Sequence, residues 1–357
     1  MGNRALQAAL GDAGLTQEKL AEAVNSAIER MTGRPGRISD RVVRRWLSGQ
    51  TRWPHPLQRR ALAMVLGRYR PNSDSFRRRA VPPSPLQRRP STEAAALALA
   101  DEALALRQRG SCSQRVRRAL YAAAAACVSS AMWAATDGRR FDAALGHHQR
   151  AASLAQESGD QAILFRVWSH KGSLYRHLGR PVDALDANDV ARRLSITRRD
   201  PLFASLGHAR HAAILGLTRD KAGVDRALGC AREAMLRADP GEGRPVRLTA
   251  FYDEAEVHSL AATAYLAAGR HAEAEARAHA SLTLFRPHLV RSRAITTARL
   301  ARAQLGQREA ERAVATAASV DAAHPRVRSM LDSFTRDLRR IAPGPLYDSW
   351  EQQWTAA

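Results

Sequence analysis

Apolar residues near the start of the chain recur at the spacing of two short helices. These positions are Leu6, Leu10, Leu15, Leu20 and Val24. Gly14 separates the two helices, because glycine tolerates a positive φ. Thr16 precedes the second helix, and its hydroxyl can accept a hydrogen bond from an amide of the first turn. The pattern therefore predicts a break at Gly14 and a second helix that begins at Gln17.

A third helix is predicted over residues 40–48, with Ser39 as its N-cap and Gly49 at its end. Its apolar face consists of Val43, Trp46 and Leu47. Because Trp46 lies on this face, we expect its side chain in the core rather than stacked on a base. A fourth helix is predicted over residues 57–66.

Helical patterning continues from residue 93 to residue 341. Runs of 13–20 residues rich in Ala, Leu and Arg alternate with short Gly, Asp or Pro breaks, and no β-rich stretch intervenes. Residues 97–106 and 119–128 are apolar nearly all round, which predicts helices buried between neighbours. The predicted fold class is all-α.

The same pattern predicts the domain boundaries. Residues 1–69 form an N-terminal domain, and residues 93–341 form a helical domain. Residues 70–92 are rich in Pro and Arg and predict an extended, semi-rigid linker, whose arginines either follow phosphates or keep the linker solvated. Residues 342–357 form a tail with an aromatic stripe at helical spacing, which favours a docking or dimer helix over a ligand cage. The stripe consists of Leu346, Tyr347, Trp350 and Trp354.

Charge points to a polyanionic partner. The 357 residues include 56 Lys or Arg and 34 Asp or Glu, a formal net charge of +22. Residues 1–90 hold 18 basic and 6 acidic residues, so the first quarter of the chain is several times more basic per residue than the rest. Only three of the basic residues are lysine, so part of the excess can reflect a general arginine bias. The distribution predicts an N-terminal module that contacts phosphates.

The order of these N-terminal motifs resembles the phage-repressor-like (Cro/Xre) helix-turn-helix family over about residues 3–67. The resemblance is carried by the segment 15–21, by Val43, Arg45, Trp46, Leu47, Gly49 and Pro54, and by residues 62–67. One departure is the long segment 25–38, which we interpret as an extended second helix followed by a loop at Pro35 and Gly36.

The resemblance implies that the third helix enters the major groove of DNA. Arg41, Arg44 and Arg45 would then read bases, with Asp40 as a further candidate, because a guanidinium can bond both acceptors of guanine. The remaining predicted contacts, mainly to phosphates, are Gln17, Arg37, Ser39, Arg52 and Arg59. The alternative is a solvated basic face whose arginines pair with Asp40 and Glu18.

The helical domain resembles a tetratricopeptide-like array. One segment carries Trp168, Gly172, Tyr175, Gly179 and Ala184, and a second repeats the register with Ala262, Tyr265, Gly269 and Ala274. Turn signals near residues 138, 179, 218–223, 269 and 306 give intervals that average 42 residues. The resemblance implies a right-handed helical-repeat solenoid whose concave surface comes from the first helix of each pair.

Concave surfaces of this kind usually bind other molecules. The register of the repeats predicts which residues lie on the surface. The candidate effector groove consists of Arg166, Ser169, Ser173, Arg176, His177, His208, His211 and Glu256. An arginine pair there could bind a carboxylate, for instance a peptide terminus. The alternative, which the sequence favours for each residue taken singly, is a solvated surface position.

No pattern of catalysis is found. Walker loops, GxGxxG turns, HExxH and nucleophile elbows are missing, and the histidines and three cysteines lack metal-ligand spacing. No stretch approaches the ~20 uninterrupted apolar residues of a membrane span, and the first residues show no secretory segment. We therefore expect a cytoplasmic chain, associated with the nucleoid, that is not an enzyme and has no cofactor, metal or membrane partner.

These observations predict a sequence-specific DNA-binding transcription regulator. It would bind double-stranded DNA as a homodimer on an inverted repeat, while the repeat domain mediates dimerisation and senses a peptide or small molecule. This domain order resembles peptide-responsive quorum-sensing regulators and the secondary-metabolism regulators of actinobacteria. The alternative is a helical-repeat interaction scaffold, or the neutralising partner of a gene pair, whose N-terminal module only tethers it to DNA.

Overall fold

The structure is a computed structural model. It describes residues 6–7, 10–11, 14–32, 34–50, 55, 57–58, 61–62, 65–66, 91–108, 112–239 and 251–356. These residues form helices, turns and irregular segments but no strand, so the all-α prediction is confirmed for this part of the chain. The chain divides into two compact units, residues 1–87 and 88–357. Their boundary falls within the predicted linker, most of which lies outside the described residues.

The first unit packs α2 (Gln17–Thr32) against α3 (Asp40–Leu47). The described residues of the predicted first and fourth helices are also helical. Their buried side chains form one cluster, in which Trp46 is 1% exposed, as expected for a core residue. The other fully enclosed members include Leu20, Val24, Ala27, Val43 and Ala61.

The segment between α2 and α3 is held by one asparagine. The Asn25 side chain donates to the carbonyl of Ile38 and accepts from its amide, both at 2.8 Å. Gly36 lies so close that a Cβ there would be 2.4 Å from Asn25 Oδ1. The predicted extension of the second helix is thus followed by a loop that is fixed to the helix, because a glycine permits the close approach.

The two predicted N-caps have different outcomes. Thr16 Oγ1 accepts from the amide of Lys19 at 3.3 Å, which confirms the first. Ser39 has the extended backbone of a cap residue, with φ −107° and ψ 166°, but its side chain makes no capping hydrogen bond. The prediction for the Ser39 side chain is therefore wrong, and only its carbonyl accepts from the first turn of α3.

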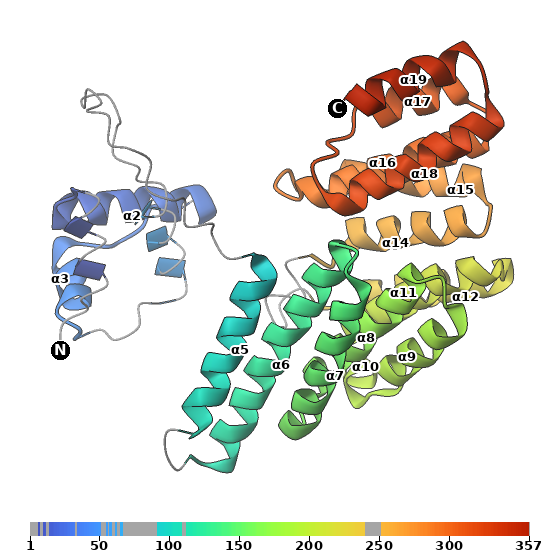
Figure 1. Ribbon diagram of the computed structural model, residues 1–357. Helices are drawn as coiled ribbons and strands as arrows, with labels where there is room; N and C mark the ends of the chain where they lie inside the picture. Colours follow the sequence, from blue (N-terminus) through green and yellow to red (C-terminus); the bar gives the residue numbers. More distant parts are fainter. Residues whose placement is uncertain are drawn as a thin grey trace, which may run out of the picture. The chain divides into compact units, whose positions relative to one another are not determined.

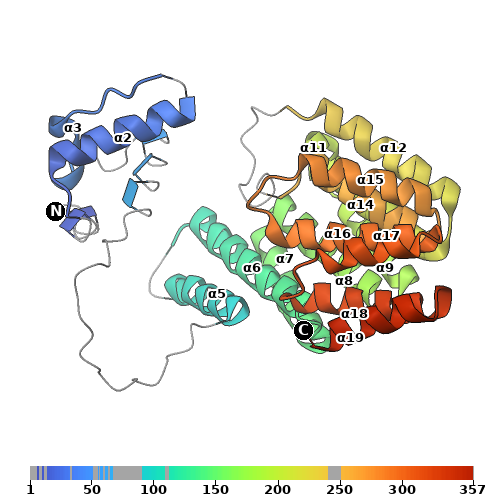
Figure 2. The same cartoon turned by 90° about the horizontal axis from the view of Figure 1, so that it is seen from above.

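The second unit is a succession of helices, most of which pack on the next one in the chain (Figure 1). They are α5 (Thr92–Gln108), α6 (Gln114–Asp137), α7 (Phe141–Ser158), α8 (Gln161–His177), α9 (Pro181–Arg193), α10 (Ser195–Arg199), α11 (Pro201–Leu215), η1 (Gly216–Thr218), α12 (Lys221–Arg237), α14 (Glu254–Ala267), α15 (His271–Leu284), α16 (Val290–Gly306), α17 (Ala310–Ala318), α18 (Pro325–Ile341) and α19 (Pro345–Ala356). Figure 2 shows the same unit from above, from teal α5 through green and yellow helices to red α18 and α19.

Five helix pairs in this unit are joined by tight turns at the predicted places. Each turn contains a residue with positive φ, namely Arg139, Gly179, Arg219, Gly269 and Arg308. In four of them the amide that follows this residue donates to the carbonyl five positions earlier at 2.8–3.1 Å, a pattern that ends a helix abruptly. Small residues let the paired helices approach: a Cβ on Gly172 of α8 would lie 3.1 Å from the Ala184 carbonyl of α9.

Burial at the start of this unit differs from the expectation. On α5 only Glu93, Ala96 and Ala100 are buried, whereas Leu99 is 56% and Leu106 is 49% exposed. The prediction of a fully buried helix over 97–106 is therefore wrong, because α5 packs on α6 along one face only. Among the helices of the described residues, α6 is long and apolar enough to cross a membrane by length and composition, a test that core helices also pass.

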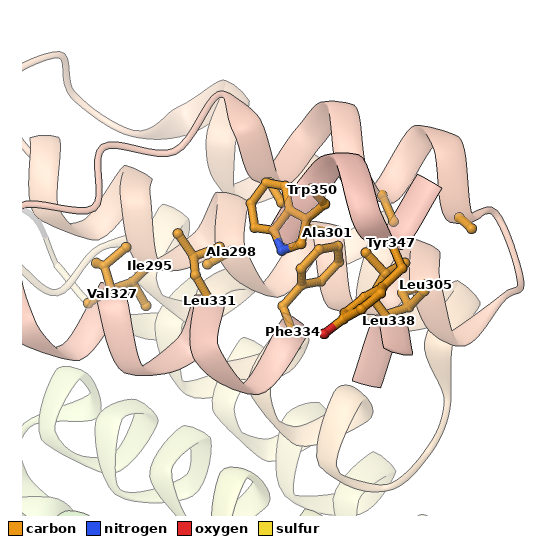
Figure 3. Packing of buried hydrophobic residues seen from close by; sticks show 13 residues of the cluster. Ile295, Ala298, Ala301, Leu305, Val327, Leu331, Phe334, Leu338, Tyr347 and Trp350 are labelled. Atoms are coloured by element: carbon orange, nitrogen blue, oxygen red, sulfur yellow. The ribbon is translucent and has the colours of Figure 1, made fainter. Parts of the chain in front are cut away.

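The aromatic stripe of the tail packs inside the chain. Trp350 is 3% exposed and its ring meets Phe334 of α18 edge-on at 5.3 Å (Figure 3). Its Nε1 donates to Thr335 Oγ1 at 2.8 Å, and Trp354 Nε1 donates to Asp332 at 3.1 Å. The stripe that was expected to dock or dimerise is thus occupied by the chain's own α18, and α19 belongs to the core of this unit.

Candidate functional site

The outer face of α3 is basic. Arg41, Arg44 and Arg45 are exposed, while Val43, Trp46 and Leu47 point into the core. Asp40 forms an ion pair with Arg44 one turn later, and this hydrogen bond lowers the pKa of the Asp40 carboxyl. The arginines are thus on a free face, although one of them shares its charge with an acid, as in the alternative interpretation.

The structure describes three of the other predicted DNA contacts. Gln17 is the first residue of α2 and is half-buried, while Arg37 and Ser39 are exposed in the segment that leads into α3. Arg52 and Arg59 lie outside the described residues. The described members therefore place polar side chains at the start of both helices.

A cavity of about 310 Å³ lies in the second unit. Its walls come mainly from α6, α8, α11, α14 and α16, with Arg326 from α18, so successive helix pairs each contribute their first helix. The helices meet there because their turns repeat at similar spacing. We call this the central cavity.

Six arginines line the central cavity, namely Arg166, Arg176, Arg210, Arg291, Arg299 and Arg326. Three of them donate to serine hydroxyls: Arg166 to Ser130 at 2.8 Å, Arg210 to Ser169 at 2.6 Å and Arg299 to Ser259 at 2.8 Å. Arg176 and the neighbouring His177 ring are 3.1 Å apart. The serine contacts of Arg210 and Arg299 orient the two guanidinium groups through neutral hydroxyls.

The remaining two arginines share one carboxylate. Asp137, the last residue of α6, pairs with Arg291 and lies 3.4 Å from Arg326. The contact between Asp137 and Arg326 joins residues that are 189 positions apart in the sequence. The ends of the helix succession are therefore tied together beside the central cavity.

Burial disfavours the charged form of several residues that line this site. Burial and the charges of Arg326 and Arg210 lower the pKa of Arg176 to about 9, and burial with the charges of Arg326 and Arg176 lowers that of Arg299 to about 9. Both remain cations at pH 7. Burial raises the pKa of Glu256, the one carboxylate among the described lining residues, against the opposing effect of Arg299, Arg210 and Arg326.

The rest of the lining is largely apolar and aromatic. Phe165 and Phe203 meet edge-on with ring centroids 5.1 Å apart, and Trp133 packs on His170 at 4.9 Å. Aliphatic side chains, among them Ile214 and Leu260, form further parts of the wall. The central cavity thus combines a cluster of cations with apolar walls, a composition suited to an anion with an apolar body.

The structure brings together part of the predicted effector groove. Arg166, Ser173, Arg176 and Glu256 line the central cavity. Ser169 lies behind the lining and accepts from Arg210, while His177 adjoins Arg176. His208 and His211 do not line the central cavity: they lie beside Arg192 and Asp189 of α9. They come from the side of α11 that faces α9, whereas Arg210 of the same helix lines the cavity.

Sequence reasoning missed Arg210, Arg291, Arg299 and Arg326. The chain has 56 Lys and Arg residues, so single arginines carry little signal. All four lie on the first helix of a pair, which is the position expected for groove residues. The repeat pattern of the later pairs was too weak to identify those helices from the sequence. Among the described residues no group of three or more His, Cys, Asp or Glu side chains is arranged to hold a metal ion.

Comparisons with known proteins reach only the first unit. A family model described as the SP15 N-terminal domain matches residues 6–70. Its name states no ligand and no activity. Comparison with curated proteins and comparison with solved structures each gave no significant match.

Proposed function

We propose that the chain is a sequence-specific DNA-binding transcription regulator. The observation that carries this proposal is α3, which buries Val43, Trp46 and Leu47 and leaves Arg41 and Arg45 exposed on its other face. In a helix-turn-helix protein of the Cro/Xre type, such a helix lies in the major groove. The planar guanidinium of each arginine would bond the two acceptors of a guanine.

Contacts to phosphate would fix the register of this helix on DNA. Gln17 begins α2, where free backbone amides and the helix dipole favour an anion. Arg37 is exposed just before α3 and would hold the adjacent backbone. These contacts would contribute to affinity but not to base preference. Their loss would therefore differ from the loss of Arg45, which would also change the preferred sequence.

The second unit would form a right-handed tetratricopeptide-like solenoid that mediates dimerisation and binds an effector. The regular turns and the central cavity built from first helices support this assignment. The regulator would then bind an inverted repeat as a cytoplasmic homodimer, without catalysis of its own. Occupation of the central cavity would change the separation of the two reading helices.

Two substitutions on the full chain test the proposal. Arg45→Ala should cost about 1–3 kcal/mol on the selected sequence and relax base preference, whereas Arg37→Ala should weaken all sequences alike. Arg232→Ala, on an exposed position of α12, is the control. Fluorescence anisotropy with selected and scrambled duplexes measures both effects. Unchanged binding by both variants would contradict the docking of α3.

The scaffold alternative makes a different prediction. A scaffold that is only tethered to DNA would recover a stoichiometric protein from host extract and bind selected and scrambled duplexes equally. The exposed arginines of α3, rather than any surface of the second unit, favour the regulator.

A further inference from the structure

We propose that the central cavity binds a small organic anion that carries two negative charges and a compact apolar body, as in an aromatic phosphate monoester or dicarboxylate. The inference deepens the effector-binding part of the proposed function by naming the chemical class. Binding to the central cavity can be measured without DNA, so the two claims fail separately.

The first argument is the balance of charge. Besides Arg166, five arginines line the central cavity, while among the described residues the carboxylates that face or pair with these five are Glu256 and Asp137. Buried cations without matching anions lose their hydration and repel one another, which is costly unless a counter-charge is supplied. A ligand with two negative charges would offset part of this excess.

The second argument is that the arginines act on one another. The charge of Arg326 lowers the pKa of both Arg176 and Arg299, and Arg176 also responds to Arg210. These residues come from four different helices, and all four line the central cavity. A hydrogen bond from a guanidinium to an oxyanion is about twice as strong as one between neutral groups.

The third argument is that the arginines have more N–H donors than their hydrogen bonds to the protein use. A guanidinium has five N–H groups. Arg210 and Arg299 are each oriented by a neutral serine, and the Nε of Arg291 is buried without a hydrogen-bond partner. Serine contacts fix the direction of each group, which is the preorganisation that anion binding requires.

Size and lining select the rest of the ligand. About 310 Å³ is at the lower end of the range for small-molecule sites, which excludes a folded peptide or a nucleic acid. Phe165, Phe203 and Trp133 provide aromatic surface against which a ring can pack. The ligand is therefore a compact amphipathic anion rather than an inorganic ion alone.

Three probes separate these contributions: phenyl phosphate, inorganic phosphate and phenol. Calorimetric titration and thermal unfolding of the full chain are measured with each probe at millimolar concentration. Phenyl phosphate should raise Tm, because it binds the folded state, and should do so more than phosphate or phenol. Equal shifts with phosphate and phenyl phosphate, or no shift with phenyl phosphate, would overturn the proposal.

Charge-removing variants locate the site. Arg299→Gln and Arg210→Gln should each weaken phenyl phosphate binding by roughly 10-fold or more. Without ligand, both should melt at the same temperature as the natural chain or higher, because each removes an uncompensated buried cation. A purely structural role would instead lower the ligand-free Tm.

The control is Arg308→Gln, which changes an exposed arginine in the turn after α16. Its phenyl phosphate affinity should match that of the natural chain. If the control and both cavity variants bind alike, the anion lies elsewhere and the proposal is wrong. If one cavity variant fails to fold, the other still decides, because the two residues lie on different helices.

Discussion

Asp40 is the residue at which two roles for α3 compete. Its carboxylate pairs with Arg44 on the exposed face, and that hydrogen bond lowers its pKa. If Asp40 reads a base, it contributes to specificity, whereas an acid that only pairs with Arg44 repels phosphate and reduces affinity. The observed ion pair favours the second role.

We therefore predict that Asp40→Asn strengthens binding to DNA of any sequence several-fold. The substitution removes a negative charge near phosphates and releases Arg44 from its ion pair. Anisotropy titrations with scrambled duplexes measure the effect, and Glu22→Gln, on an exposed position of α2, is the control. Weaker binding with a changed base preference would instead assign base reading to Asp40.

His148 illustrates the cost of a buried titratable group. It is 5% exposed and its Nε2 has no hydrogen-bond partner. Burial, with a smaller effect of Lys171, lowers its pKa from 6.5 to about 4. Below pH 6.5 the unfolded chain therefore takes up a proton that the folded chain does not, so stability falls as the pH drops from 6.5 towards 4.

Replacing this histidine should reduce that pH dependence. Between pH 7.5 and pH 5, His148→Leu should lose about 2 kcal/mol less unfolding free energy than the natural chain. Urea unfolding at both pH values measures the difference, and the half-exposed His279→Leu is the control. Parallel pH profiles for His148→Leu and the natural chain would contradict the burial argument.

At the scale of elements, α19 completes the second unit. Trp350 packs on Phe334 and hydrogen-bonds to Thr335, so this helix covers the last apolar face of α18. Trp350→Ala should cost roughly 3–5 kcal/mol, because it empties a buried aromatic site. The oligomeric state should not change, since the stripe is satisfied within the chain.

Thermal unfolding and sedimentation velocity test the two parts of this prediction. Gln352→Ala, at an exposed position of the same helix, should alter stability by less than about 0.5 kcal/mol. A Trp350→Ala chain that keeps its Tm but changes its association state would restore the tail as a dimer element.

The helices of the second unit were largely predictable, because their ends carry local signals. Gly179 and Gly269 occupy turns that need a positive φ, whereas Arg219 and Arg308 adopt the same conformation without such a signal. Burial was less predictable: α5 has the composition of an enclosed helix but exposes Leu99. Composition does not tell whether a second neighbour covers a helix.

The candidate site was predictable only in part. The register of the well-matched pair gave Arg166, Ser173 and Arg176, which line the central cavity. Arg299 and Arg326 join them through packing of distant helices, a long-range property that spacing along the chain does not carry. His208 and His211 of α11 lie against α9 instead of the central cavity, because two sides of α11 have different neighbours.

At the scale of the whole molecule, the excess of +22 has two locations. Part lies in the first 90 residues, where we propose phosphate contacts, and part lies around the central cavity. Salt should distinguish them, because exposed charges are screened far more than buried ones. DNA affinity should fall by roughly 10³ or more between 50 and 200 mM salt if about six phosphates are neutralised. Phenyl phosphate affinity should fall much less, and equal salt slopes in the two titrations would contradict this division.

The central claim is that α3 reads a DNA sequence. The most direct test is to sequence the duplexes that the purified full chain selects from a random pool, alongside a chain with Arg41→Ala, Arg44→Ala and Arg45→Ala. The account predicts that the natural chain enriches an inverted repeat with half-sites about one helical turn apart, and that the triple variant enriches none. A pool without enrichment, or the same motif selected by both chains, would contradict it.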